Sequence, residues 1–277
     1  MDGSVKAGYE TILYEVADGV AIVTLNRPER MNALNDQIVS ELYEAMWRAN
    51  ADRDARVIIL TGSGRAFCAG GDIDGFGAID PKTLVTKLPR TFDGDRRPDY
   101  QARHIYFPRL SKPVIGMLNG ATAGLGLLYA LACDIRFAAD SAVFTTAYVR
   151  RGLSAEYGAA WMLARVVGHA NAVELLLSGR KFLAPEAKEL GLVHRIYPAE
   201  RLREETFSYA REMALSCSPR AMRALKYQLY EVPFQTLHEA VLTANSDMVV
   251  ANASADFKEG TRSFVEKRPP KFSSEDV

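Results

Sequence analysis

Two glycine-rich stretches are the parts of this sequence best suited to binding a reacting group. Residues 62–73 and residues 119–126 each follow a short apolar run that is typical of a buried strand. Glycine lets a ligand approach the backbone closely, and N–H groups at a helix start lack partners within the helix. Both stretches could therefore be plain tight turns, or could aim N–H groups at one negatively charged oxygen. Neither keeps the G-x-G-x-x-G or G-K-[ST] spacing of nucleotide-binding loops.

One acidic residue, Glu156, is a candidate for proton transfer. We expect Ser154 to cap a helix and Glu156 to lie in its first turn, where an acidic side chain commonly complements the helix dipole. In an apolar pocket, the same carboxyl could instead move protons, because burial raises its pKa toward the useful range. The residues alone leave both interpretations open.

Other reactive side chains are better explained as structural. Cys68 has no histidine near it in the sequence, and a small buried thiol is the expected role. His104, on an expected short helix before Pro108, is a lone histidine, and Asp72 is expected to order its turn or cap the next helix. Histidines, cysteines and carboxylates show no metal-ligand spacing, so we predict no metal site.

Alternating strands and helices must position these candidates. A hairpin is predicted at residues 11–16 and 20–25 around Asp18-Gly19, a pair that accepts positive φ angles. Apolar residues at helical spacing predict a helix over residues 38–49. Further strands are predicted at residues 57–60, 114–118, 134–138 and 142–144. A small-residue helix through Ala132 is expected after the second glycine stretch, and helical faces are expected over residues 160–167, 172–177 and 207–217. Ser218-Pro219 is a helix start.

Composition narrows the class of protein. The 277 residues carry 34 basic and 34 acidic side chains, so the chain lacks the positive surplus typical of nucleic-acid binding. We see no apolar run of the roughly 20 residues a membrane span needs and no secretory signal. Three separated cysteines indicate reduced thiols, so we expect a cytoplasmic globular protein. Residues 74–97 are predicted to be a mobile insertion.

Four motifs in register resemble the crotonase (enoyl-CoA hydratase/isomerase) superfamily. They are Asn26-Arg27-Pro28 with Asn32-Ala33-Leu34, then residues 66–73, residues 119–134 and the tail 260–269, and the resemblance extends over residues 10–272. It implies an α/β fold in which residues 1–200 form a spiral of repeated β-β-α units. Residues 201–277 would then form a helical region that mediates assembly into a homotrimer or a hexamer of two trimers.

The resemblance also implies an acyl-CoA thioester substrate. Its carbonyl oxygen would be held in an oxyanion hole by the backbone N–H groups of Gly71 and Leu125, with Gly124 beside them. Leu125 stands where the family usually has glycine, but a backbone donor needs no particular side chain. Coenzyme A enters as part of the substrate, and no permanently bound cofactor is expected.

Binding of the CoA moiety is implied for a second group of residues. The matching positions are Arg27, Arg30, Ala66, Ala69, Phe264 and Lys267. The arginines would face the phosphates, the alanines would lie near the pantetheine and adenine, and the last two would reach a neighbouring subunit's ligand. Solvated surface or ordinary packing would explain the charged and aromatic members equally well.

The acid–base positions depart from the pattern of the family's hydratases. Two glutamates of those enzymes match Leu128 and Tyr148 here, and neither residue can be a carboxylate base. Tyr148 could donate a hydrogen bond or simply pack. Certain isomerases of the family carry an acidic residue at the position of Glu156, so we favour double-bond isomerisation. A hydratase with relocated groups, a C–C hydrolase or lyase, and a non-catalytic acyl-CoA-binding protein stay open.

Overall fold

The structure, a computed structural model, describes residues 8–72 and 98–273. The insertion predicted at residues 74–97 lies outside these ranges.

The chain begins with the predicted hairpin. Strands β1 (Ile12–Ala17) and β2 (Val20–Leu25) pair antiparallel. Asp18 and Gly19 join them with φ angles of 50° and 81°, which is the double positive-φ turn that suits the twist of a hairpin. The Asp18-Gly19 pair between the two strand sequences is therefore sufficient to predict this turn.

The hairpin forms one edge of a six-stranded sheet with the order β1-β2-β3-β5-β7-β10. From β2 onward, all neighbours run parallel. The added strands are β3 (Val57–Gly62), β5 (Val114–Leu118), β7 (Ile135–Ala139) and β10 (Arg195–Tyr197). Every residue of β3 and β5 is buried, as expected for parallel strands covered on both faces.

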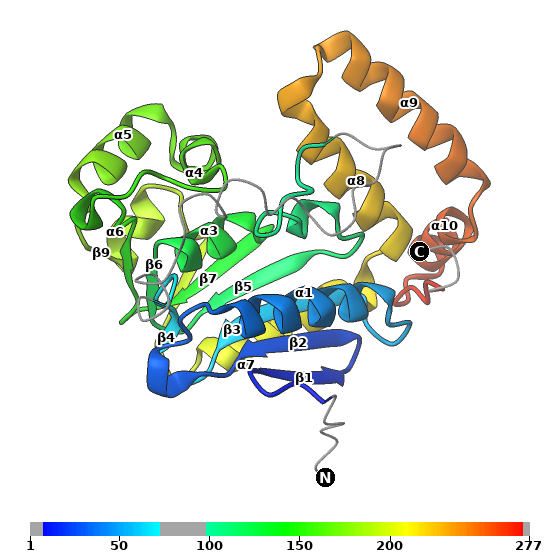
Figure 1. The fold of residues 1–277 in the computed structure, drawn as a ribbon. Coiled ribbons are helices and arrows are strands. Elements are labelled where there is room, and N and C mark those ends of the chain that lie inside the picture. The colour runs from blue at the N-terminus through cyan, green and yellow to red at the C-terminus, as the bar shows by residue number, and fades with distance from the viewer. Residues whose placement is uncertain (1–7, 73–97, 274–277) are drawn as a thin grey trace.

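Two helices cover the sheet (Figure 1). Helix α1 (Asp36–Ala51) packs on β1–β3, and its buried residues include Ile38, Leu42 and Ala49, as the helical spacing predicts. The Asn35 side chain caps α1 by accepting a hydrogen bond from the Ile38 N–H at 3.0 Å. Helix α7 (Leu202–Ser216) packs on β2, β3, β5 and β7.

A four-stranded sheet, β4-β6-β8-β9, accompanies the first. Its strands are β4 (Ala66–Cys68), β6 (Ala121–Ala123), β8 (Val143–Thr145) and β9 (Phe182–Leu183). Successive strand pairs β3/β4, β5/β6 and β7/β8 place their first member in the large sheet and their second in the small one. This repetition is the expected spiral of β-β-α units, and the fold prediction is confirmed.

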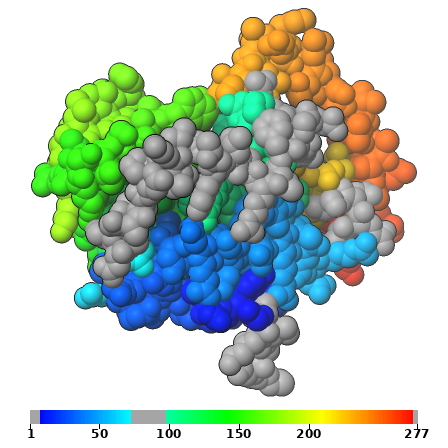
Figure 2. Space-filling model, viewed as in Figure 1, coloured from blue at the N-terminus to red at the C-terminus, as the bar shows by residue number. Residues whose placement is uncertain are grey.

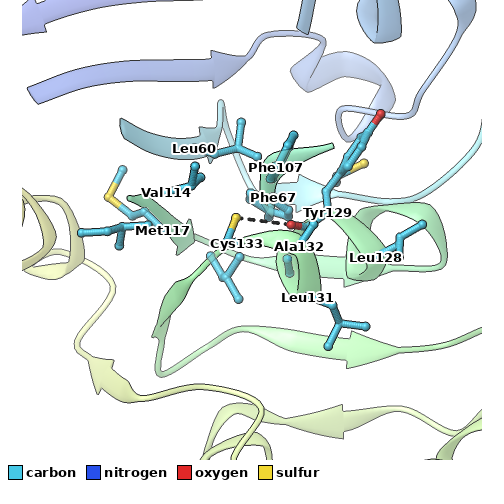
Figure 3. Packing of buried hydrophobic residues seen from close by; sticks show 14 of the residues in the cluster. Leu60, Phe67, Phe107, Val114, Met117, Leu128, Tyr129, Leu131, Ala132 and Cys133 are labelled. Carbon is cyan, nitrogen blue, oxygen red and sulfur yellow. Dashed lines mark hydrogen bonds between the residues drawn. The ribbon is translucent and has the colours of Figure 1, made fainter. Parts of the chain in front are cut away.

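Helix α3 (Leu125–Ala132) runs through the centre of the molecule. All its residues are buried, and Figure 3 shows Leu128, Tyr129 and Leu131 among the core side chains. The Cys133 thiol donates to the Tyr129 carbonyl oxygen at 3.3 Å. Phe107 stacks on Tyr129 with ring centroids 5.6 Å apart. This apolar surrounding fixes α3 firmly behind the second glycine stretch.

The helix expected from Ser154 begins later, so this prediction is wrong. Tyr157 and Gly158 have φ angles of 49° and 77°, which interrupt a right-handed helix, and α4 starts at Ala159 (Ala159–Val167). Its buried face includes Met162, whereas Ala160 is exposed. The short helix expected at His104 is a turn that precedes the 3-10 helix Phe107–Arg109. Helices α5 (His169–Ser178) and α6 (Ala184–Glu189) follow α4.

The C-terminal helices are α8 (Pro219–Glu231), α9 (Leu237–Ala253) and α10 (Ala255–Glu266). Ser218 caps α8, as predicted. The buried Lys226 ammonium anchors α8 to the body through the Asp134 carboxylate at 2.8 Å and the Phe107 carbonyl oxygen at 3.0 Å. Helix α9 buries no residue and projects from the body (Figure 2). None of the helices in the described ranges is long and apolar enough to cross a membrane.

Candidate active site

A cavity of about 250 Å³ lies where the two glycine stretches meet. Six candidates of the sequence analysis line it together: Ala69, Gly71, Gly124, Leu125, Tyr148 and Glu156. The other lining residues are Gly70, Thr146, Ala147, Arg151 and Leu153. Residues distant in sequence therefore share one small chamber.

Two backbone N–H groups at this cavity have no acceptor among the described residues. The backbone of Leu34 is hydrogen-bonded to the residues on either side of Gly71. The Leu34 N–H donates to the Gly70 carbonyl oxygen at 2.8 Å, and the Leu34 carbonyl oxygen accepts from the Asp72 N–H at 3.0 Å. The Gly71 N–H between them has no acceptor in the part of the chain that the structure describes. Leu125 is the first residue of α3, and no side chain caps that helix end.

Close backbone approach brings the two turns together. Gly70 has a φ of 98°, and a Cβ built on it would lie 2.9 Å from the Ala123 carbonyl oxygen and 3.6 Å from the Leu125 nitrogen. A Cβ on Gly126 would lie 2.2 Å from the Cys68 carbonyl oxygen. Only glycine permits such contacts, so the glycines set the separation of the two N–H groups.

Two asparagine side chains hold the first glycine stretch, and that of Asn119 also joins the second stretch to the first. The Asn32 amide nitrogen donates to the carbonyl oxygens of Ala66 at 2.8 Å and Ser63 at 3.0 Å. The Asn119 amide nitrogen donates to the Gly64 carbonyl at 2.9 Å, and its amide oxygen accepts from the Gly62 N–H at 3.2 Å. Sequence reasoning noted both residues as motif members but missed this role. Asparagine in a glycine-rich turn was the available signal, because its amide mimics backbone groups.

Glu156 approaches the cavity from the loop before α4. Its side chain is half-buried and makes no hydrogen bond or ion pair with the described residues. Burial raises the pKa of its carboxyl above the usual range. Because α4 begins only at Ala159, the expectation that Glu156 lies in a helix's first turn is wrong, and the dipole interpretation loses its basis.

The two positions that match hydratase glutamates have different surroundings. Leu128 is fully buried in the core and is not among the cavity-lining residues. Tyr148 lines the cavity with only 6% of its surface exposed, and its hydroxyl has no hydrogen-bond partner in the described part of the chain. Burial, and then the neighbouring Glu156 charge, raise the pKa of the Tyr148 phenol.

Of the residues expected to bind the substrate or its CoA moiety, Ala69, Gly124 and Tyr148 line the cavity, whereas Arg27, Arg30, Ala66, Phe264 and Lys267 do not. The Arg27 guanidinium pairs with the Asp72 carboxylate at 2.9 Å, which is how Asp72 orders its turn. Ala66 is fully buried in β4. Arg30 is exposed at the end of the 3-10 helix Pro28–Arg30, and Phe264 and Lys267 are exposed at the end of α10.

His104 and Cys68 are structural, as expected. The His104 Nδ1 lies 2.8 Å from the Tyr129 hydroxyl, and burial lowers the His104 pKa to about 4. Burial raises the pKa of the Cys68 thiol to about 12, so it carries no thiolate near neutrality. In residues 8–72 and 98–273, no group of three or more His, Cys, Asp and Glu side chains could hold a metal ion.

The spiral of β-β-α units with a helical C-terminal region is the crotonase fold, which is shared by solved enoyl-CoA hydratases. The chain belongs to the enoyl-CoA hydratase/isomerase family, whose sequence model matches residues 15–275. It is therefore an acyl-CoA-processing enzyme, as the four motifs indicate.

The chain is similar to proteins that are named as hydratases and to one that is named as an isomerase. A Rhodobacter capsulatus protein named "Probable enoyl-CoA hydratase" is 40% identical over 96% of this chain and 98% of its own. The "1,2-epoxyphenylacetyl-CoA isomerase" of Escherichia coli is 34% identical over 95% and 98%. The crystal structure of an enoyl-CoA hydratase from Bacillus anthracis has a TM-score of 0.86 at 29% identity, covering 96% of this chain and 100% of the other.

Proposed function

We propose that the protein is an enoyl-CoA isomerase that shifts a carbon–carbon double bond next to a CoA thioester. The N–H groups of Gly71 and Leu125 form its oxyanion hole, and Glu156 carries the proton. One observation supports this assignment above the others: the cavity that holds the two acceptor-free N–H groups contains a single carboxyl side chain among the described residues.

A single carboxyl is sufficient for the reaction. The Glu156 carboxylate removes a proton from Cα of a 3-enoyl thioester, and the electrons spread over a dienolate whose oxygen is negative. The two N–H groups bind this oxygen, and each such donor typically lowers the barrier by ~3–4 kcal/mol. The carboxylic acid then returns the proton to Cγ, and the double bond moves from Cβ–Cγ to Cα–Cβ. No atom is gained or lost.

Burial of Glu156 suits this role. A carboxyl that takes a proton in one step and returns it in the next works best when its pKa lies near the operating pH. The raised pKa of Glu156 is a shift in this direction, and it arises from desolvation alone.

Hydration is the second candidate, and the 40% identity to a protein named as a hydratase favours it. Water addition needs one group that activates water and another that protonates Cα. Leu128 and Tyr148 stand at the positions of the hydratase glutamates, so a hydratase mechanism here would need Glu156 in a different role. Product mass separates the candidates, because hydration adds one water and isomerisation adds nothing.

The test is conversion of a panel of 2-enoyl- and 3-enoyl-CoA thioesters, followed by mass spectrometry. We expect products of unchanged mass from 3-enoyl substrates. Glu156→Gln should lower kcat by ~10²-fold or more with little change in KM, because the amide keeps the shape but cannot take the proton. Glu189→Gln, at an exposed position on α6, is the matched control. An unchanged rate in Glu156→Gln would exclude the proposed shuttle.

We also propose that the C-terminal helices join copies of this chain into a trimer or a hexamer of two trimers. Helix α9 has no buried residue, and large apolar side chains of α9 and α10 face solvent, including Val249 at 72% and Phe264 at 86% exposure. A second copy that covers them would remove this apolar surface from water. The expectation that Phe264 and Lys267 act at a neighbour's ligand depends on this assembly.

A further inference from the structure

The buried hydroxyl of Tyr148, a residue that lines the cavity, has no explanation in the fold. Within the described part of the chain, seven residues hold a buried side-chain nitrogen or oxygen without a hydrogen-bond partner, and Tyr148 alone of these lines the cavity. A buried hydroxyl without a partner is unfavourable compared with an apolar group of the same shape. The neighbouring Thr146 shows the normal arrangement, since its hydroxyl donates to the Leu175 carbonyl at 2.8 Å.

The backbone that delivers Tyr148 is held in a strained conformation. Ala147 has a φ of 61°, which an alanine rarely adopts. The Thr145 hydroxyl stabilises this turn by accepting from the Ala147 N–H at 3.1 Å and donating to the Gly179 carbonyl at 3.0 Å. Contacts to the end of α5 therefore fix the direction in which Tyr148 enters the cavity.

Glu156 is positioned in a similar way by the loop before α4. Tyr157, the next residue, has a φ of 49°. Its ring packs edge-on against His104, with centroids 4.3 Å apart, and His104 is in turn hydrogen-bonded to Tyr129. Strained backbone thus brings Tyr148 and Glu156, whose phenol and carboxyl have no partners among the described residues, to the lining of one cavity of about 250 Å³.

We propose that Tyr148 is a positioning residue for Glu156: its hydroxyl donates a hydrogen bond to the ionised carboxylate and holds it in the cavity beside the two N–H groups. A phenol is a donor and an ionised carboxylate is an acceptor, so each group supplies what the other lacks. The two groups are not hydrogen-bonded to each other in this structure, in which the Tyr148 hydroxyl has no partner among the described residues. We expect the bond to form when Glu156 is charged and to weaken when Glu156 takes up the substrate proton. This inference rests on the proposed role of Glu156 in proton transfer.

Few other charges act on Glu156 from the described residues. Arg151 lines the same cavity, and Tyr157 adjoins Glu156 in the chain. Beyond Tyr157 lie Arg103 and Asp36, which pair with each other at 2.8 Å. The hydroxyl of Tyr148 is the neutral donor in this set, so its removal leaves the surrounding charges unchanged.

The test compares Tyr148→Phe with Tyr106→Phe. Tyr106 has the same kind of buried, unpartnered hydroxyl but does not line the cavity. Both variants remove only one oxygen and keep the shape of the ring, so both should stay folded; Tyr106→Phe should not lower the melting temperature, because its hydroxyl has no partner among the described residues. The carboxyl of Glu156 is titrated in ligand-free protein by ¹³C NMR with labelled glutamate, and Glu156→Gln identifies its signal.

We expect Tyr148→Phe to raise the Glu156 pKa by about one unit, because the ionised form loses a hydrogen bond. The acidic limb of the kcat/KM profile should move to higher pH by the same amount. The kcat should fall by about tenfold with KM nearly unchanged. Tyr106→Phe should leave all of these values at wild type.

Two results would overturn the inference. One is an unchanged Glu156 pKa in Tyr148→Phe. The other is an activity loss confined to substrates with an oxygen on the acyl chain, which would assign the hydroxyl to the substrate. The NMR titration needs no turnover, so it still decides the inference if the wild type isomerises no substrate and the proposed function fails.

Discussion

Gly126→Ala tests whether the separation of the two turns controls activity. Gly126 is the second residue of α3, directly after Leu125, the proposed N–H donor. The new Cβ would lie 2.2 Å from the Cys68 carbonyl oxygen and 2.7 Å from the Cys68 Cβ. Real Cβ contacts essentially never fall below 3.0 Å, so α3 and β4 must separate by about 0.8 Å. Both partners at the closest contact are rigid, because one is helix and the other is strand backbone.

This movement carries the Leu125 N–H away from that of Gly71. A displacement of ~1 Å in a reacting geometry can lower the rate by ~10²-fold, so we expect kcat/KM to fall by about that factor. Overpacking should also lower the free energy of unfolding by ~1–3 kcal/mol. The gain in helix propensity from Gly to Ala, about 1 kcal/mol, offsets part of this loss.

Gly260→Ala is the matched control. Gly260 also lies within a helix, α10, but the Cβ there would meet only the Phe272 ring at 3.7 Å, an ordinary contact. This variant should keep full activity and gain up to about 1 kcal/mol of stability. Steady-state kinetics on the converted enoyl-CoA and urea unfolding measure both quantities. Wild-type kcat/KM in a folded Gly126→Ala protein would refute the argument that glycine sets the distance between the donors.

Two further predictions concern assembly and pH. Val249→Asp should shift the protein from trimer or hexamer to monomer in light scattering without loss of helical signal, since Val249 is exposed in the single chain; an unchanged mass would place the interface elsewhere. Burial lowers the His104 pKa from 6.5 to about 4, so the unfolded chain binds the extra proton first as the pH falls. Because of His104, the free energy of unfolding should fall by about 2 kcal/mol as the pH is lowered from 7 to 5. The lowered pKa of His194 should add to this loss of stability. Urea unfolding of His104→Gln should show a smaller pH dependence, and an equal one would contradict this assignment.

The sequence by itself determined the elements and the family. The hairpin at Asp18-Gly19, the buried face of α1 and the cap at Ser218 depend on neighbours in the chain, and short-range patterns predict them correctly. The four motifs in register were sufficient for the crotonase fold. The sequence alone also shows that positions 128 and 148 hold Leu128 and Tyr148 and not glutamate.

Only the tertiary structure decided how the candidate site is built. Positive φ angles at Tyr157 and Gly158 end the helix that the pattern around Ser154 predicted and leave Glu156 in a loop. The Tyr148 hydroxyl, which has no partner in the described ranges, and the hydrogen bonds of Asn32 to the first glycine stretch depend on groups far away in the chain. Whether a polar atom finds a partner, and whether a carboxyl loses water, is decided by segments that meet only after folding. Local sequence patterns do not predict these tertiary contacts, so the chemistry of the cavity could be derived only from the folded structure.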